Sequence, residues 1–173
     1  MIFHIYTDEL VVGDVVFLDV GTTVEKLVLS MEDNMQITAM CFAANTLFQL
    51  QKKNISQIIM GGGYYHPSST VFESEAIIPI MNGLRATKAF IAPAAVDMDL
   101  GLTCSVPYDK TIKELEIKNS HKVIALITSN KFGKVKSTQF GTWNDVDVVI
   151  TDKGIPKEWV DFFKDREIEL FIV

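Results

Sequence analysis

Seven short runs of apolar, often β-branched residues recur along the 173-residue chain, and they constrain its fold more than any other feature. Each run is nearly continuous in apolar residues, as expected for strands that are covered on both faces. The segments between most runs are long enough for crossover helices. We therefore predict an α/β fold with a mostly parallel central sheet of about six to seven strands and helices on both faces. The runs cover Val15–Val20, Ile37–Phe42, Gln57–Met60, Lys88–Ala92, Val123–Ile127, Val146–Ile150 and Ile168–Val173.

The segments between these strands carry helix signals. Asn45 can cap the second predicted helix with its side-chain oxygen. The glycine-rich segment Gly61–Ser69 and the following Thr70 form a predicted loop that is long enough to cover a site. The predicted helices are Thr22–Met31, Asn45–Lys52, Phe72–Asn82, Tyr108–Asn119 and Lys157–Arg166.

Composition indicates one globular domain over residues 1–173, with 48% hydrophobic residues and a net charge of −6. The negative charge argues against direct binding of a phosphodiester backbone by these residues. No apolar run approaches the roughly 18 residues that span a bilayer, so we expect a soluble, cytoplasmic protein without membrane contact. Cys41 and Cys104 lie far apart, without histidines at metal spacing, so we expect reduced thiols and no metal or cofactor.

The junction Asp19-Val20-Gly21-Thr22-Thr23 follows directly on an apolar strand and opens a predicted helix. A glycine turn at this place aims unpaired N–H groups outward, the threonine hydroxyls add donors, and the helix dipole favours negative charge. An ordinary turn and helix start explain these residues equally well, but an anion would bind here.

Other polar residues follow the remaining strands. Ligands of an open parallel sheet bind beyond the carboxyl ends of its strands, so these residues are expected to share one edge. Neutral donors, two acids and a lysine suit a phosphorylated polyol. The set comprises Asp19, Gly21–Thr23, Asn45, Thr46, Gly61–Gly63, Ala94–Asp97, Ser129–Lys131 and Gly133.

Two lysines and one cysteine allow two interpretations each. Lys131, in a polar turn, either complements a phosphate or carbonyl oxygen or faces water. Lys113 shares a helix with Lys110 and Lys118, a pattern more typical of a solvated face. Cys104 could line the pocket, but a small buried core residue is the better interpretation.

The chain lacks the motifs G-x-S-x-G, G-x-x-x-x-G-K and G-x-G-x-x-G. The sequence therefore does not contain a complete set of catalytic residues that would support an enzyme interpretation.

A series of short segments between Gly13 and Asp152 forms a recognisable pattern. The segments are Gly13–Thr23, Asn45-Thr46-Leu47, Gly61-Gly62, Lys88–Ile91, Asp97 with Gly101-Leu102-Thr103, Lys131-Phe132-Gly133 and Val149–Asp152. In their order and spacing they resemble the effector-sensing domain of DeoR-family regulators of sugar metabolism. That domain is similar in fold to ribose-5-phosphate isomerase and glucosamine-6-phosphate deaminase.

The resemblance implies a sensor that binds a phosphorylated sugar or related metabolite and thereby changes how a helix-turn-helix domain holds its operator. We expect that domain to be absent from this chain, so that DNA is a partner only through it. A homo-oligomer, dimer or tetramer, is also expected. The candidate effector-binding residues are Asp19, Gly21, Thr22, Thr23, Asn45, Gly61, Gly62, Asp97 and Lys131.

The chain departs from the family pattern at several positions. Glu73 or Ser74 and Ala95 replace usual glycines, and Thr128 and Asp109 replace a usual acid and glutamate. Ala94 stands where the related isomerases place a catalytic acid, which favours binding over turnover. The leading hypothesis is a non-catalytic sensor of a repressor. The alternatives are a sugar-phosphate isomerase or deaminase that uses Lys131 with Asp97 or Asp19, and a scaffold that only dimerises the regulator.

Overall fold

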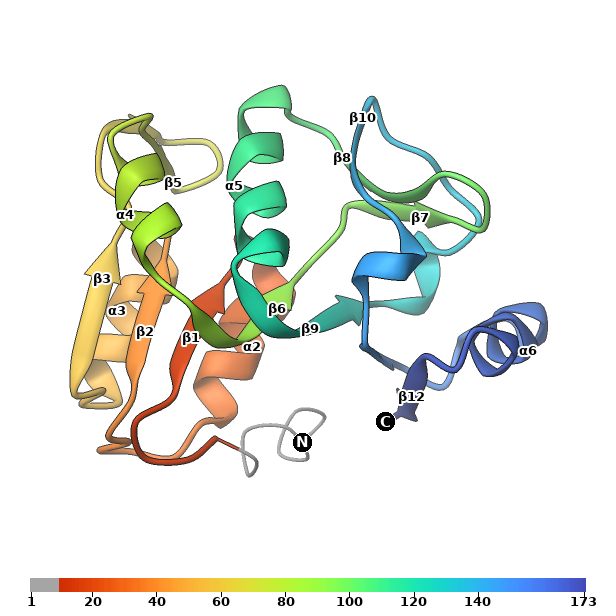
Figure 1. The fold of residues 1–173 in the computed structure, drawn as a ribbon, viewed down its shortest axis with the longest axis horizontal. Helices are drawn as coiled ribbons and strands as arrows, with labels where there is room; N and C mark the ends of the chain where they lie inside the picture. The colour runs from red at the N-terminus through yellow and green to blue at the C-terminus, as the bar shows by residue number, and fades with distance from the viewer. Residues whose placement is uncertain (1–9) are drawn as a thin grey trace.

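The computed structural model describes residues 10–173 and is built around a seven-stranded, all-parallel sheet (Figure 1). Every neighbouring pair of its strands is parallel, as the nearly continuous apolar runs predict. In spatial order the strands are β12 (Glu169–Ile172), β11 (Val148–Thr151), β9 (Ser120–Ile127), β6 (Ala86–Ile91), β1 (Val15–Leu18), β2 (Thr38–Cys41) and β3 (Gln57–Met60).

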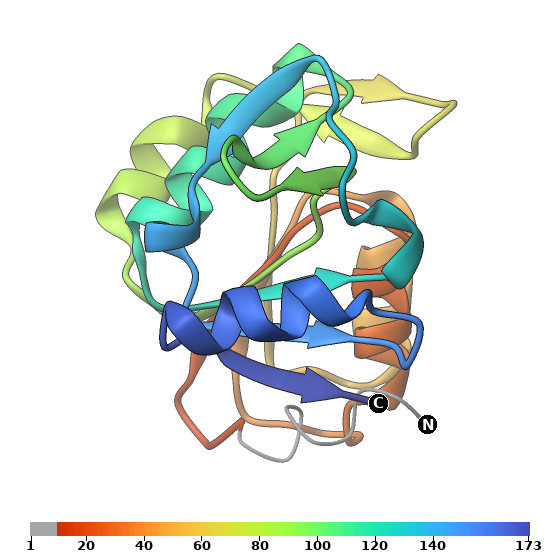
Figure 2. The ribbon, with the colours of Figure 1, turned by 90° about the vertical axis from the view of Figure 1, so that its right-hand side faces the viewer.

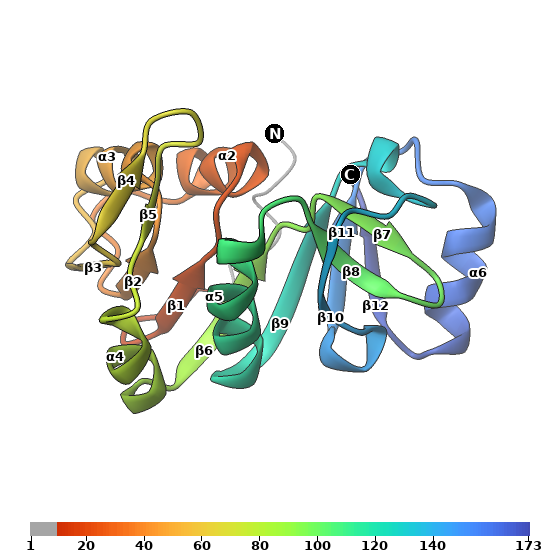
Figure 3. The same cartoon turned by 90° about the horizontal axis from the view of Figure 1, so that it is seen from above.

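Helices cover both faces of this sheet, which confirms the predicted architecture. Helices α2 (Thr22–Ser30) and α3 (Ala44–Lys52) lie on one face, and α4 (Ile77–Gly83) and α5 (Pro107–Lys118) lie on the other (Figure 3). Helix α6 (Lys157–Asp165) runs alongside β11 and β12 (Figure 2). Four of the five predicted helices agree with these bounds to within one residue at each end.

Two small antiparallel sheets complete the described part of the chain. A hairpin of β4 (Tyr64–His66) and β5 (Val71–Glu73) occupies most of the predicted loop. The second sheet has the order β10 (Thr138–Gly141), β8 (Gly101–Cys104) and β7 (Ala95–Asp97). Two short 3-10 helices, η1 (Ser129–Lys131) and η2 (Trp143–Asp145), flank β10.

Two local predictions are wrong. The helix predicted from Phe72 begins only at Ile77, because Val71–Glu73 pairs with β4. Asn45 does not cap α3, which begins at Ala44 with Ala43 as its N-cap and has no side-chain cap.

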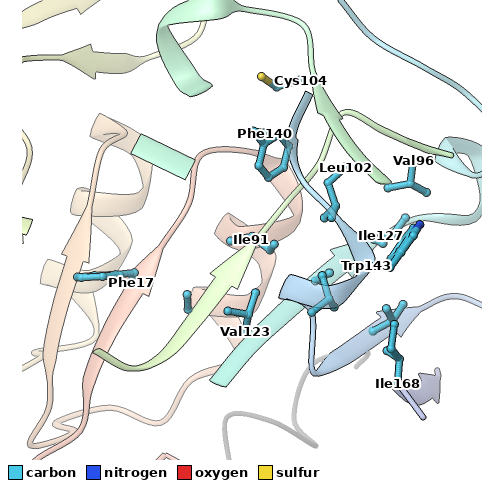
Figure 4. Close-up of a cluster of buried hydrophobic side chains, with 14 of the residues drawn as sticks. Phe17, Ile91, Val96, Leu102, Cys104, Val123, Ile127, Phe140, Trp143 and Ile168 are labelled. Carbon is cyan, nitrogen blue, oxygen red and sulfur yellow. The ribbon is translucent and has the colours of Figure 1, made fainter. Parts of the chain in front are cut away.

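The core has two halves, one on each face of the sheet, because alternate residues of a strand point to opposite faces. In β1, Val16 and Leu18 pack in the cluster that contains Leu27 of α2. Phe17 belongs to the opposite cluster, where Ile91, Val123 and Trp143 also lie (Figure 4). None of the helices in residues 10–173 combines the length and the apolar character needed to cross a bilayer.

Candidate functional site

Helix α2 begins directly after β1 and presents an uncapped first turn. Its N-cap residue, Gly21, has a φ of 136°, a conformation that L side chains rarely adopt, which explains the glycine. No side chain caps the first turn. The N–H groups there and the positive end of the helix dipole are therefore suited to an anion, as the sequence predicts.

A cavity of about 350 Å³ opens at this turn. The structure brings four of the candidate residues into its wall: Gly21, Thr22, Thr23 and Lys131. Cys104 also lines the cavity, although the residue is only 2% exposed. It is therefore both a pocket-lining residue and a buried core residue, which are the two interpretations that the sequence allows. The other lining residues are Val20, Ala92, Pro93, Ala94, Ser105, Val106, Asp109 and Lys113.

Lys131 ends the short helix η1, which follows β9. Its Nζ donates a hydrogen bond to the carbonyl oxygen of Pro93 at 2.8 Å. Burial, together with the positive charge of Lys113, lowers the pKa of Lys131. An ammonium group held in this way is positioned to complement an anion in the cavity.

A buried ion pair joins Asp19 to Lys113. Nζ of Lys113 lies 2.6 Å from Oδ1 of Asp19 and also contacts Oδ2, and Oδ2 accepts a hydrogen bond from the backbone N–H of Ala92 at 2.8 Å. Asp19 is 1% exposed and Lys113 is 2% exposed, so the interpretation of Lys113 as a surface lysine is wrong. Burial alone would lower the pKa of Lys113, but the charges of Asp19 and Glu116 raise it.

Two further carboxyl groups of α5 belong to the same charged cluster. Glu116 is fully buried, and neither of its carboxyl oxygens has a hydrogen-bond partner within residues 10–173. Burial, together with the negative charge of Asp19, raises the pKa of Glu116 well above its ordinary value. Burial also raises the pKa of Asp109 to about 6, against the opposing effect of Lys113.

Five of the candidate residues do not line the cavity. Asp19 is one of them, although the lysine that it binds, Lys113, does line it. Asn45 instead links α3 to α2 and the hairpin, because it donates to Glu25 at 2.7 Å and accepts from Thr70 at 3.1 Å. Asp97 closes the turn between β7 and β8 by accepting the N–H groups of residues 99 and 100, each at 3.0 Å. Gly61 and Gly62 follow β3, farther along the sheet.

The ring of Phe42 packs so closely against Gly61 that no larger residue fits there without a shift. This contact leads to a prediction about stability. A Cβ atom at this position would lie 2.6 Å from the ring of Phe42. Gly61→Ala should therefore lower the free energy of unfolding by about 1–3 kcal/mol through overpacking. Urea unfolding measures this loss. Gly62→Ala is the matched control, because a Cβ there meets nothing within 4 Å.

Sequence reasoning identified Asp109 only as a departure from the family pattern, and it placed neither Asp109 nor a buried Lys113 at the site. Residues 109, 113 and 116 are spaced by four and three, so they lie on one face of α5. That spacing is the signal that could have identified them as a cluster. Within residues 10–173, no group of three or more His, Cys, Asp or Glu side chains is arranged to hold a metal ion.

Known protein families and individual proteins show which family this chain belongs to. Residues 6–153 match the sequence model of the family described as "DeoR C terminal sensor domain". The deoxyribose operon repressor of Escherichia coli K12 is 26% identical over 154 residues, which are 89% of this chain and 61% of the repressor. The glycerol-3-phosphate regulon repressor of the same organism is 24% identical over 158 residues, 91% of this chain and 63% of that protein. The chain thus spans less than two thirds of the length of these relatives.

The fold also has a similar solved structure, ribose 5-phosphate isomerase A from Methanocaldococcus jannaschii. The TM-score is 0.53 at 10% sequence identity, over 76% of this chain and 52% of the isomerase. At this identity the likeness concerns the fold alone, which is the isomerase-like α/β fold that the sequence predicts. On the match of residues 6–153, the chain belongs to the family of DeoR C-terminal sensor domains.

Proposed function

We propose that the cavity beside α2 binds a phosphorylated sugar or related polyol and that its occupancy regulates a transcriptional repressor. One observation carries the proposal: the uncapped first turn of α2, the hydroxyl-bearing Thr22 and Thr23, and the ammonium group of Lys131 share one cavity of about 350 Å³. This volume is within the usual range of small-molecule sites. The relatives that are named as repressors of sugar and glycerol-phosphate operons support the same assignment.

The bonding of the two lysines at the cavity argues against their use in acid–base catalysis. Lys113 is held by both oxygens of Asp19, and Lys131 donates to the carbonyl of Pro93. A general acid or base must be free to exchange a proton with the substrate. Ala94, which lines the cavity, has no titratable group at all. The isomerase alternative would require conversion of an aldose phosphate into a ketose phosphate, which a steady-state assay would detect.

Lys131→Ala tests the binding site. We expect the affinity for the best sugar phosphate to fall at least tenfold, because a charge-assisted hydrogen bond to phosphate contributes about 1.5–3 kcal/mol. Isothermal titration calorimetry with pentose, hexose, amino-sugar and glycerol phosphates measures this change. The matched control is Lys134→Ala, which removes an exposed lysine of the same loop that does not line the cavity.

Two results would contradict the proposed site. One is an equal loss of affinity in the Lys131 and Lys134 variants, which would indicate a general charge effect. The other is the absence of binding by every phosphate in the panel.

In a protein that joins this domain to a DNA-binding segment, the phosphate that binds should change operator affinity, and Lys131→Ala should abolish that response. Such a change requires the effector to bind one of two states more tightly.

A further inference from the structure

The wall of the cavity is built from two chemically different parts. The β1–α2 junction and Lys131 contribute N–H, hydroxyl and ammonium donors. The β8–α5 junction contributes Cys104, Ser105, Val106 and Asp109. The second part also contains the Ser105 hydroxyl and the start of α5, which has no side-chain cap. A phosphate is better suited to the first part, because the ionised carboxylate of Asp109 repels it and can only accept hydrogen bonds.

Asp109 is half-buried at this wall and has no partner for its carboxylate. Its side chain makes no hydrogen bond and no ion pair with any of residues 10–173, although its backbone N–H bonds to the carbonyl of Val106. Lys113, four residues later, would be its ordinary partner on a helix. The ammonium group of Lys113 is instead bound by Asp19. The cavity wall thus includes a half-buried acceptor without a donor among the described residues.

We propose that Asp109 is a specificity-determining residue that accepts a hydrogen bond from an effector hydroxyl while the effector phosphate lies against the first turn of α2 and Lys131. This inference rests on the proposed function and adds an orientation and a ligand class. The class is the monophosphates of polyhydroxylated compounds. A second phosphate at the far end would meet the carboxylate of Asp109, so bisphosphates are disfavoured.

The charges around Asp109 support its role as an acceptor at neutral pH. Lys113 on α5 and His66 on β4 favour the ionised form, whereas Asp19 after β1 and Glu73 on β5 disfavour it. Burial raises the pKa to about 6, so the group is mainly ionised at pH 7.5. Because a hydroxyl donor would replace the lost hydration of the carboxylate, a hydroxyl-bearing ligand gains affinity that a bare phosphate does not.

Calorimetry at pH 7.5 with Asp109→Asn tests the inference. The probes are methyl phosphate, ribose 5-phosphate, glucose 6-phosphate, glucosamine 6-phosphate and fructose 1,6-bisphosphate. We expect the unaltered domain to bind the best hydroxyl-bearing monophosphate at least about tenfold more tightly than methyl phosphate, as a hydrogen bond to a charged group allows. In Asp109→Asn this preference should fall about tenfold, while methyl phosphate and the bisphosphate should bind as well as before or more tightly, since a negative charge has been removed.

The opposite response of the two ligand types separates specificity from structure. If Asp109 had a merely structural role, Asp109→Asn would weaken the binding of both ligand types, and that result would overturn the inference. The inference would also be overturned if the unaltered domain bound hydroxyl-bearing monophosphates no more tightly than methyl phosphate. Asp109→Glu, which keeps the carboxylate, should retain most of the preference. Glu114→Gln on the same helix is the control, because it removes an exposed charge whose only ion-pair partner among residues 10–173 is Lys110.

The same titrations distinguish the inference from the proposed function. If methyl phosphate binds the unaltered domain and this binding is lost in Lys131→Ala, the anion site is supported, whatever the result for Asp109→Asn. An unchanged preference in Asp109→Asn would then overturn the inference alone. If no phosphate binds, both proposals fail together.

Discussion

Asp19→Ala should lower the free energy of unfolding by about 3–5 kcal/mol, the expected cost of breaking a buried ion pair. The substitution leaves the ammonium group of Lys113 uncompensated at 2% exposure and removes the acceptor of the Ala92 N–H. Urea unfolding followed by circular dichroism measures the loss. The effect should persist at high salt, because buried charges are screened much less than exposed ones.

Two comparisons separate this effect from a general loss of charge. Asp33→Ala removes the partner of Lys53, but Asp33 is 65% exposed and the loss should stay below about 1 kcal/mol. The double variant Asp19→Ala/Lys113→Met removes both charges and should recover much of the stability. Equal losses in the two single variants, or a double variant less stable than Asp19→Ala, would mean that the pair does not contribute in this way.

The position of Lys113 shows where sequence reasoning fails. Three lysines on one helix are the usual pattern of a solvated face, and for Lys110 that pattern is correct because its side chain is 45% exposed. Lys113 is buried because its partner, Asp19, is 94 residues away in the sequence and lies at the end of a neighbouring buried strand. A local pattern contains no information on such a distant partner, so the burial of Lys113 could be found only in the structure.

The large sheet was predictable because its signal is local. Each of its strands overlaps one of the predicted apolar runs, and the intervening segments have helical length. The small sheets were not predictable in this way. Their strands have three or four residues, and Val71–Glu73 is a strand only because it pairs with Tyr64–His66. Such pairing overrides the weak helical preference of a short segment.

The candidate site was predictable only in part, for a geometric reason. The carboxyl ends of all parallel strands share one edge, but neighbouring strands are about 4.8 Å apart, so residues after distant strands do not meet. The cavity wall draws on residues after β1, β6 and β9, which are consecutive in the sheet. Asn45 and Gly61 follow β2 and β3 on the outer side. Asp97 pairs with Gly101 at the turn between β7 and β8, at the opposite end of β8 from Cys104. Sequence alone did not contain this strand order.

Glu116 should make the domain less stable as the pH rises above 5. Burial and the charge of Asp19 raise its pKa, so the folded state keeps a proton that the unfolded chain releases near the ordinary value of 4.5. Because the folded state binds more protons in this range, the free energy of unfolding falls with increasing pH. Glu116→Gln removes the titration. Its stability relative to the unaltered domain should therefore increase as the pH rises from 5 to 7.

Urea unfolding of both proteins at pH 5, 6 and 7 measures this difference. Other groups with raised pKa values, such as Asp109, titrate in both proteins and cancel in the comparison. Glu114→Gln, an exposed position on the same helix, should show a stability difference that does not change with pH.

If the stability difference for Glu116→Gln is also constant with pH, or if its pH dependence reverses, Glu116 is ionised in the folded state and the positive charge of Lys113 outweighs the effect of burial. The ion pair of Asp19 and Lys113 would then be one part of a buried triad in which Lys113 compensates two carboxylates, and Lys113→Met should cost more than Asp19→Ala.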